Sequence, residues 1–134
     1  VGSEMCIRDS PKGARQHVTA GPYSPVLEVD ARHLVVISGQ VAVDLEGHTI
    51  GDTIEEQTVA TLRNCAGHLA TAGCSLSDVF KVNIYLTDLA DFAAVNAVMA
   101  RYFAEPYPAR ACVQVAALPR GAAVEIEATM VVKS

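Results

Sequence analysis

Apolar and polar residues alternate with a period of two over residues 79–87, which read VFKVNIYLT. In an extended chain every second side chain points to the same face, so one face of this segment would be apolar and the other polar. The pattern predicts a half-buried strand. Its apolar face would consist of Phe80, Val82, Ile84 and Leu86.

Residues 53–73 have the period of an amphipathic helix instead. Thr53 followed by Glu56 is the sequence of a capping box, in which each side chain bonds the backbone amide of the other residue. Apolar residues then recur at steps of three or four, and Gly73 stands where such a helix would end. The recurring positions are Val59, Leu62, Ala66 and Leu69.

A second helix is predicted after residue 87. Asp88 or Asp91 would cap it, because short acidic side chains accept bonds from the free amides of a first helical turn. Pro106 and Pro108 would end it. Its buried stripe would consist of Phe92, Val95, Met99 and Tyr102 or Phe103.

Three further segments have the composition of strands. Residues 34–43 are rich in β-branched residues, and Ser38-Gly39 interrupts them in the manner of a bulge or of a close approach to a ligand. Residues 110–117 and 123–132 flank a Leu-Pro-Arg-Gly turn, and we expect them to form a hairpin.

The order of these elements predicts an α+β sandwich in which both helices cover one face of a mixed sheet. The second, partly polar face would stay uncovered in a single chain. Hydrophobic residues make up 51% of the 134 residues, charged residues make up 19%, and the mean hydropathy is +0.27. One domain of this size carries more apolar surface than a compact monomer buries, so we expect another copy of the chain to cover the open face.

Charge and composition argue against several functions. A formal net charge of -5 and a pI near 5.2 disfavour nucleic acid as a partner, because phosphate binding needs a basic surface. No apolar run approaches the roughly 20 residues of a membrane span, and the start lacks a secretion signal, so we expect a cytoplasmic protein. The four cysteines and four histidines lack the spacing of a zinc site, and we expect no metal.

The first ten residues, VGSEMCIRDS, have no periodicity that links them to the rest of the chain. They resemble translated adapter sequence at the end of a reading frame, and a disordered native tail is the alternative. We therefore expect one domain over residues 11–134.

Arg110 and Glu125 are the main candidates for chemistry. Arg110 follows Ala109 and Pro108 at the start of an apolar segment, where its planar fork of donors suits a small carboxylate. Glu125 on the partner strand would steer a water. Taken alone, each has a plainer interpretation, Arg110 as an exposed or salt-bridged arginine and Glu125 as part of a solvated strand face.

Cys112 is a third candidate in the same stretch. It would share a strand face with Arg110, but no histidine lies at a spacing that would activate its thiol. A small buried hydrophobe is therefore favoured over a nucleophile.

Five motifs, in this order, resemble the RidA/YjgF family. The resemblance covers the chain from about Arg15 to the C-terminus. The motifs are GPYSP at residues 21–25, SGQ at 38–40, TDLADFAAVN at 87–96, PARAC at 108–112 and ALPRGAAVEIEA at 117–128.

The resemblance implies a homotrimer with a chorismate-mutase-like sandwich, a mixed sheet of about six strands and sites in the clefts between subunits. It implies hydrolysis of reactive 2-imino and enamine acids to 2-oxo acids and ammonia, without a cofactor. By the matching motifs, Arg110 would hold the substrate carboxylate and Glu125 would lie near the attacking water. The other pocket positions would be Tyr23, Ser38, Gly39, Asn96 and Cys112.

The predicted hairpin adds a geometric expectation. With its turn near Pro119 and Arg120, Gln114 lies opposite Glu125, and Arg110 lies about 13 Å from Glu125 at about 3.3 Å per residue. One small substrate does not span that distance, so the two residues that serve one substrate would come from different subunits. The alternative function is a non-catalytic trimeric module that binds 2-oxo acids or related carboxylates with the same arginine.

Overall fold

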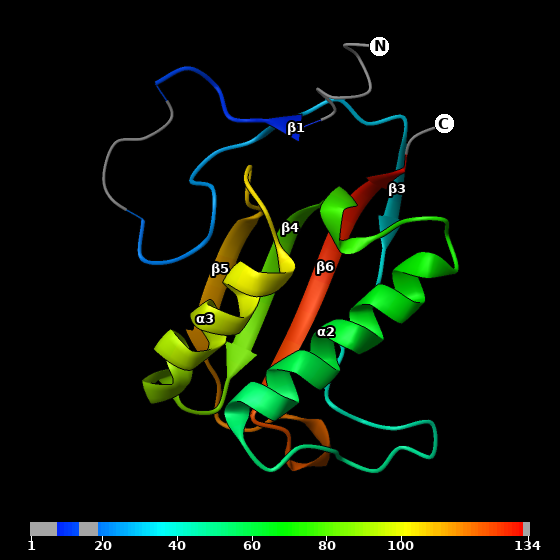
Figure 1. The fold of residues 1–134 in the computed structure, drawn as a ribbon, viewed down its shortest axis with the longest axis vertical. Coiled ribbons are helices and arrows are strands. Elements are labelled where there is room, and N and C mark those ends of the chain that lie inside the picture. The colour runs from blue at the N-terminus through cyan, green and yellow to red at the C-terminus, as the bar shows by residue number, and fades with distance from the viewer. Residues whose placement is uncertain (1–7, 14–18, 133–134) are drawn as a thin grey trace.

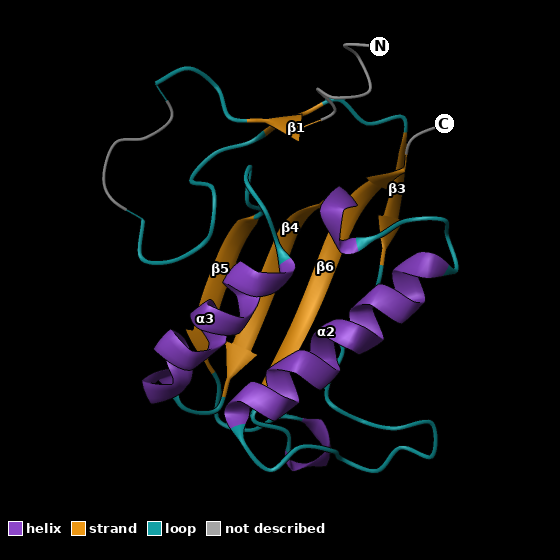
Figure 2. Ribbon diagram, viewed as in Figure 1, coloured by secondary structure: helices purple, strands orange, loops and turns teal. Residues whose placement is uncertain are grey.

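The computed structural model of the chain describes residues 8–13 and 19–132, so most of the predicted tail at residues 1–10 lies outside it. The described residues form two layers, with two long helices on one face of a mixed sheet (Figures 1 and 2). The α+β class is confirmed. The main elements are α2 (Ile54–Ala70), α3 (Phe92–Tyr102), β3 (His33–Val36), β4 (Val79–Leu86), β5 (Ala109–Gln114) and β6 (Val124–Val132). The short ones are β1 (Arg8–Asp9), β2 (Glu28–Val29), η1 (Leu76–Asp78), η2 (Leu89–Asp91) and η3 (Pro119–Gly121).

The main sheet has four strands in the order β3-β6-β4-β5. Strand β6 runs antiparallel to β3 and β4, whereas β5 runs parallel to β4. Single bridges join Ser24 to Ala109 at the β5 edge and Gln40 to Ile126 beyond the end of β3. Six strands in this sheet are therefore not confirmed within the described residues, because β1 and β2 pair only with each other.

Both helices begin close to the predicted positions. Thr53 Oγ1 accepts a hydrogen bond from Glu56 N (3.1 Å), and Glu56 Oε1 accepts one from Thr53 N (3.2 Å), so the predicted capping box is confirmed. Asp88 Oδ1 accepts from Ala90 N (2.9 Å) and caps η2, which leads into α3. Asp91 stands at the N-cap of α3 and makes no side-chain cap bond.

The core lies between the helices and the sheet. Alternate residues of β4 and β6 are buried, which confirms the half-buried strand predicted over residues 79–87, and β4 ends one residue earlier, at Leu86. A β-bulge between Val79 and Lys81 shifts the alternation, so Val79 occupies the core and Phe80, predicted to do so, is only half-buried. The fully buried residues of the two strands include Val79, Val82, Ile84, Leu86, Val124, Ile126 and Met130.

The predicted hairpin of the last two strands is wrong, because β4 lies between β5 and β6 and pairs with both (Figure 1). The connection through η3 passes the end of β4, where Val115 N donates to Leu86 O (2.8 Å) and Thr87 N donates to Ala123 O (3.2 Å). The crossover through α3 sets β5 parallel to β4, as in a βαβ unit. Alternation along a strand indicates its faces but not its neighbouring strands. The short turn between the last two strands therefore favours a hairpin when the sequence is considered alone.

The face of the sheet opposite the helices is open in the described chain. Leu34, Val36 and Val113 are 58%, 68% and 45% exposed there, although large apolar side chains are usually covered. Contact with another copy would cover them, and the homotrimer stays a prediction. No helix within the described residues is long and apolar enough to cross a membrane.

Candidate functional site

Arg110 lies on β5 and points to the helix side of the sheet, because its register partner on β4 is the buried Val82. Its Nη1 donates to Asn96 Oδ1 on α3 (2.7 Å). Its Cζ lies 5.0 Å from the centroid of the Tyr23 ring and 5.4 Å from that of Phe92. Two aromatic faces and one amide therefore hold the guanidinium in place.

The guanidinium of Arg110 is half-buried and charged. Burial lowers its pKa, while electrostatic interactions with Cys112 and Tyr23 raise it, and an arginine stays protonated at neutral pH under such shifts. No carboxylate within the described residues forms an ion pair with it. The remaining donors of the fork can therefore bind an anion from outside the chain.

The GPYSP motif forms a loop that presents Tyr23 to Arg110. Gly21 has a φ of 135°, and a Cβ at this position would lie 2.8 Å from Asn96 Nδ2 and 2.9 Å from Arg110 Nη2, so only glycine fits. Ser24 anchors the loop to the start of β5, since its amide donates to Pro108 O (3.0 Å) and its hydroxyl donates to Tyr107 O. The loop is thus fixed beside the arginine.

Asn96 connects the three parts of this cluster. It accepts the bond from Arg110 of β5, and its Nδ2 donates to Ala20 O in the loop (3.4 Å). Because Asn96 projects from α3, one side chain links helix, strand and loop. Asn96 can therefore orient the guanidinium of Arg110.

Cys112 lies two residues from Arg110 on the same face of β5 and is half-buried. Burial raises the pKa of its thiol, and the charge of Arg110 lowers it by a smaller amount. The thiol form therefore prevails at neutral pH, and a thiolate is the form that acts as a nucleophile. The geometry suits a wall of the pocket.

Glu125 belongs to a second cluster, on the open face of the sheet. It is registered with Tyr85 of β4, between the buried residues Val124 and Ile126. Its carboxylate packs against Gly39, where a Cβ would lie 2.3 Å from Glu125 Oε2. The absence of a side chain at Gly39 makes this close approach possible.

Gln40 holds the Ser38–Gly39 segment beside β6. Its amide donates to Ile126 O (2.8 Å), its carbonyl accepts from Ile126 N (2.9 Å), and its side-chain Nε2 donates to Ser38 O (3.0 Å). The pair Ser38 and Gly39 is exposed and lies next to Glu125. The predicted close approach at this interruption is therefore to a side chain of the same chain.

Glu127 is fixed on the open face two residues after Glu125. Tyr85 OH donates to Glu127 Oε1 (2.7 Å), and Asn83 Nδ2 donates to the same oxygen (3.1 Å). These bonds lower the pKa of Glu127, and the bond to Glu127 raises the pKa of Tyr85. Glu127 is therefore an ordered carboxylate, engaged within its own chain.

Arg110 and Glu125 lie on opposite faces of the sheet. Arg110 is registered with Val82 and Val82 with Ala128, which is three residues from Glu125. At about 3.3 Å per residue and about 4.8 Å per strand, their Cα atoms are about 14 Å apart. The structure thus brings Tyr23, Asn96, Arg110 and Cys112 into one cluster and Ser38, Gly39 and Glu125 into another, and it does not bring the two clusters together.

Three residues that contribute to these clusters are absent from the sequence-based set of candidates. Ser24 and Gln40 position a loop each, and they lie inside the motifs GPYSP and SGQ. Phe92, which the periodicity predicts to lie in the buried stripe of its helix, contacts the guanidinium of Arg110 from the first residue of α3. Position within a motif is the signal that could have found all three, because Phe92 lies inside TDLADFAAVN.

Two cavities within the described residues adjoin these clusters. One, of about 720 Å³, borders Tyr23 and Ser24, and the other, of about 910 Å³, lies on the outer side of α2. Neither is lined by Arg110 or Glu125. Within the described residues no group of three or more potential metal ligands occurs.

Comparison with known proteins gives a consistent result. A family model described as Endoribonuclease L-PSP matches residues 14–132. Protein DfrA of Myxococcus xanthus is 45% identical over 113 residues, covering 83% of this chain and 86% of that protein. A 2-iminobutanoate/2-iminopropanoate deaminase of Capra hircus is 41% identical over 119 residues, covering 88% of this chain and 85% of that protein.

The fold agrees with the sequence matches. The crystal structure of RidA from an Antarctic Psychrobacter bacterium has 40% identity and a TM-score of 0.71, and the match covers 92% of this chain and 99% of that one. The family match, the shared fold and the five ordered motifs lead to one conclusion: the chain belongs to the endoribonuclease L-PSP family, also known as RidA/YjgF.

Proposed function

We propose that the protein hydrolyses small 2-imino acids, and their enamine tautomers, to 2-oxo acids and ammonia. The observation that carries this proposal is the guanidinium of Arg110, which forms no ion pair within the described residues, contacts the rings of Tyr23 and Phe92 and is oriented by Asn96. A 2-imino acid carries a permanent carboxylate next to its electrophilic carbon. A fixed anion clamp therefore positions that carbon without any contact to the reacting bond. The deaminase name of the Capra hircus relative supports the same reaction class.

The chemistry needs one water and one proton acceptor. As the water oxygen bonds to the imine carbon, the π electrons of the C=N bond move to nitrogen, which takes up a proton. Glu125 accepts this proton from the attacking water and delivers it to nitrogen, which gives a tetrahedral carbinolamine. Glu125 then carries the remaining hydroxyl proton to the amino nitrogen, the C–N bond breaks, and ammonia leaves as the C=O bond forms. Such proton transfer contributes about 10²–10⁴-fold, a modest demand for a reaction that already proceeds in water.

The two clusters would meet only between copies of the chain. Because Arg110 and Glu125 lie on opposite faces and about 14 Å apart, a complete site requires the Arg110 cluster of one subunit and the Glu125 cluster of another. We propose a homotrimer in which each cleft between subunits pairs the two clusters. The exposed apolar residues of the open face, Leu34, Val36 and Val113, support such a contact.

The test is an imine assay with freshly generated 2-iminopropionate or 2-iminobutanoate, in which semicarbazide traps unreacted imine. The wild type should lower the trapped product. Arg110→Ala should reduce kcat/KM by about 10²-fold or more, because it removes charge-assisted bonds to the substrate. Arg32→Ala, at an exposed loop arginine, is the matched control and should retain activity. Full activity in Arg110→Ala would remove the clamp from the mechanism.

Subunit mixing separates the shared site from a site within one chain. Arg110→Ala and Glu125→Gln oligomers should each have low activity alone. After exchange of subunits, verified by mass spectrometry of tagged chains, activity should reappear because some clefts then contain intact Arg110 and Glu125. No recovery in mixed oligomers would contradict the shared site.

One observation favours the alternative of a non-catalytic module that binds 2-oxo acids or related carboxylates. Within one chain the clamp is complete, whereas the proton acceptor is on the other face of the sheet. Calorimetric binding of pyruvate by a protein that leaves the trapped imine unchanged would support this function. Turnover that depends on both Arg110 and Glu125 would exclude it.

A further inference from the structure

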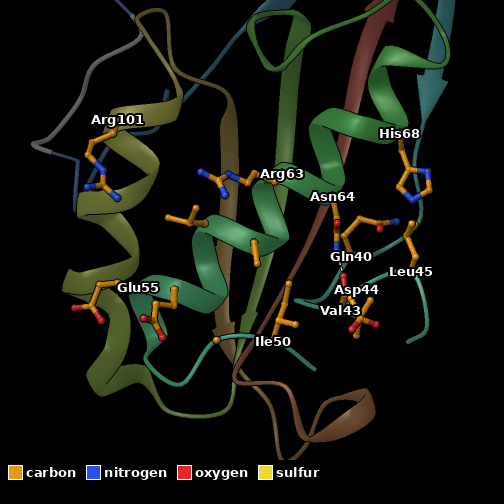
Figure 3. Close-up of a pocket in the computed structure, with 14 residues that line it drawn as sticks. Gln40, Val43, Asp44, Leu45, Ile50, Glu55, Arg63, Asn64, His68 and Arg101 are labelled. Carbon is orange, nitrogen blue, oxygen red and sulfur yellow. Dashed lines mark hydrogen bonds between the residues drawn. The ribbon is translucent and has the colours of Figure 1, made fainter. Parts of the chain in front are cut away.

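A groove of about 910 Å³ runs over the outer side of α2, and of the residues in the clusters described above only Gln40 lines it (Figure 3). Its sides are the loop at residues 40–51 and the C-terminal part of α3, represented by Arg101. A volume of this size falls in the range of small-molecule sites, about 300–1,000 Å³. None of the residues assigned to substrate binding or catalysis lines it.

The walls of the groove contain apolar side chains that the chain itself leaves uncovered. Leu45 is fully exposed and Ile50 is 40% exposed, both on the loop. Val43 of the loop and Val59 and Ala60 of α2 are half-buried and complete the apolar part. The groove therefore offers an apolar surface to a ligand.

The loop that forms one wall is held in place. Asn64 of α2 donates from Nδ2 to both Val41 O (2.9 Å) and Val43 O (3.0 Å), as the dashed line at Asn64 in Figure 3 indicates for Val43. Arg120 Nη1 donates to Gly47 O (2.7 Å), and Gln57 Nε2 donates to Gly51 O (3.2 Å). The wall is thus preformed, which lowers the entropic cost of binding.

Two arginines at one end of the groove have no anionic partner in the part of the chain that the structure describes. Figure 3 shows Arg63 extending from α2 toward the side where Arg101 lies on α3. Within the described residues neither guanidinium forms a salt bridge or a hydrogen bond, and both are exposed. Two neighbouring guanidinium groups attract an anion, and their planar shape suits carboxylate, phosphate or sulfonate oxygens.

The groove also contains three carboxylates, and Figure 3 shows two of them, Asp44 and Glu55, away from Arg63. Glu56 accepts bonds from the amides of Asp52 (2.8 Å) and Thr53 (3.2 Å), and Asp44 pairs with His48 (3.5 Å). Glu55 stands in the first turn of α2, about two turns before Arg63 at 3.6 residues per turn. Its charge would disfavour an anion at that end and so orient a ligand with its anionic group toward Arg63.

From these contacts we infer that the groove over α2 is a second binding site, distinct from the imine site, for an organic anion with an apolar body. The anionic group lies between Arg63 and Arg101, and the apolar body lies against Val43, Ile50 and Val59. Recognition combines the charge of the two guanidinium groups with burial of the apolar walls. The inference does not depend on the proposed deaminase activity.

The test compares two fluorescent probes of similar shape, anionic 8-anilinonaphthalene-1-sulfonate and neutral N-phenyl-1-naphthylamine. The wild type should bind the anionic probe at least 10-fold more tightly than the neutral one. Arg63→Gln/Arg101→Gln should abolish that preference by weakening the anionic probe alone. Lys12→Gln/Arg32→Gln changes the net charge equally at exposed sites outside the groove and should leave both affinities unchanged.

A further variant tests the apolar wall. Ile50→Ser should weaken both probes, because each loses contact with the same surface. Equal affinity of wild type and Arg63→Gln/Arg101→Gln for the anionic probe overturns the inference, as does an equal loss in the Lys12→Gln/Arg32→Gln control. A fall in sedimentation coefficient of the groove variants would show that the groove is a contact between copies, which also overturns it. Imine hydrolysis should be unchanged in all these variants, so its loss would concern the other site.

Discussion

Gly39→Ala is a sharp test of the Glu125 cluster, because the structure gives the size of the perturbation. The new Cβ would lie 2.3 Å from Glu125 Oε2 and 2.8 Å from its Cδ, whereas ordinary contact begins at 3.4 Å. The carboxylate must therefore move by about 1.1 Å, the difference between 3.4 and 2.3 Å. Misplacement of a reacting group by about 1 Å costs about 10²-fold in rate. We expect kcat for imine hydrolysis to fall by about that factor.

The same geometry predicts that stability is preserved. The obstructing atoms belong to the far end of a flexible side chain, and Gly39 does not have the positive φ that only glycine adopts readily. KM should change little, because the carboxylate clamp belongs to the other cluster. Activity with 2-iminopropionate and urea denaturation of the same preparation measure both properties.

The matched control is Gly67→Ala, in the interior of α2. A Cβ at Gly67 meets nothing within 4 Å, and alanine stabilises a helix by about 0.5–1 kcal/mol relative to glycine. Gly67→Ala should keep full activity and gain slightly in stability. If folded Gly39→Ala has the wild-type kcat, catalysis does not require the position of the Glu125 carboxylate beside Gly39. Loss of folding in Gly39→Ala would refute the view that the carboxylate can move aside.

Three other expectations concern single residues. Tyr85→Phe should lower the free energy of unfolding at pH 7 by about 1 kcal/mol, the low end for a bond to a charged group because the pair is partly exposed. Bonds from Tyr85 and Asn83 lower the folded pKa of Glu127, so this stabilisation is present above the pKa of an unfolded glutamate, about 4.3, and is lost as pH falls through the folded pKa. Urea titrations of wild type and Tyr85→Phe should therefore converge in acid, and a constant difference would contradict the assignment. Thr53→Ala removes the cap of α2 and should cost about 1 kcal/mol in the same titrations, whereas no loss would mean that the cap is replaced by water. Burial raises the pKa of Cys65 to about 12, so a thiol reagent such as Ellman's should label Cys65 only after unfolding, and rapid labelling of the native protein would contradict its burial.

The helices and the central strand could be predicted from the sequence because their signals are local. The capping box at Thr53 and the alternation along residues 79–86 each depend on neighbours a few positions apart. The order of strands depends on contacts between residues far apart in the chain. The position of β4 between β5 and β6 does not change the alternation of apolar and polar residues in either strand, so the sequence does not indicate it. The bulge that moves Val79 into the core in place of Phe80 likewise has no signal in the sequence.

The candidate site was predictable only in part. Arg110, Tyr23 and Asn96 were all named from motifs that lie far apart in the chain, and the structure brings them within hydrogen-bond or ring-contact distance. Their roles stay a proposal. The opposite facing of Arg110 and Glu125 could not be read from spacing, because it depends on which strand lies between them.

Under the proposed shared site, the chains associate head to tail, because the surface that carries Arg110 differs from the surface that carries Glu125. An open pair of such chains would contain one finished pocket, with one clamp and one acid left idle at its ends. In a closed ring every Arg110 cluster faces a Glu125 cluster. Dilution below the ring's dissociation constant would therefore switch turnover off while every chain kept its fold, and the specific activity would report assembly as directly as it reports chemistry.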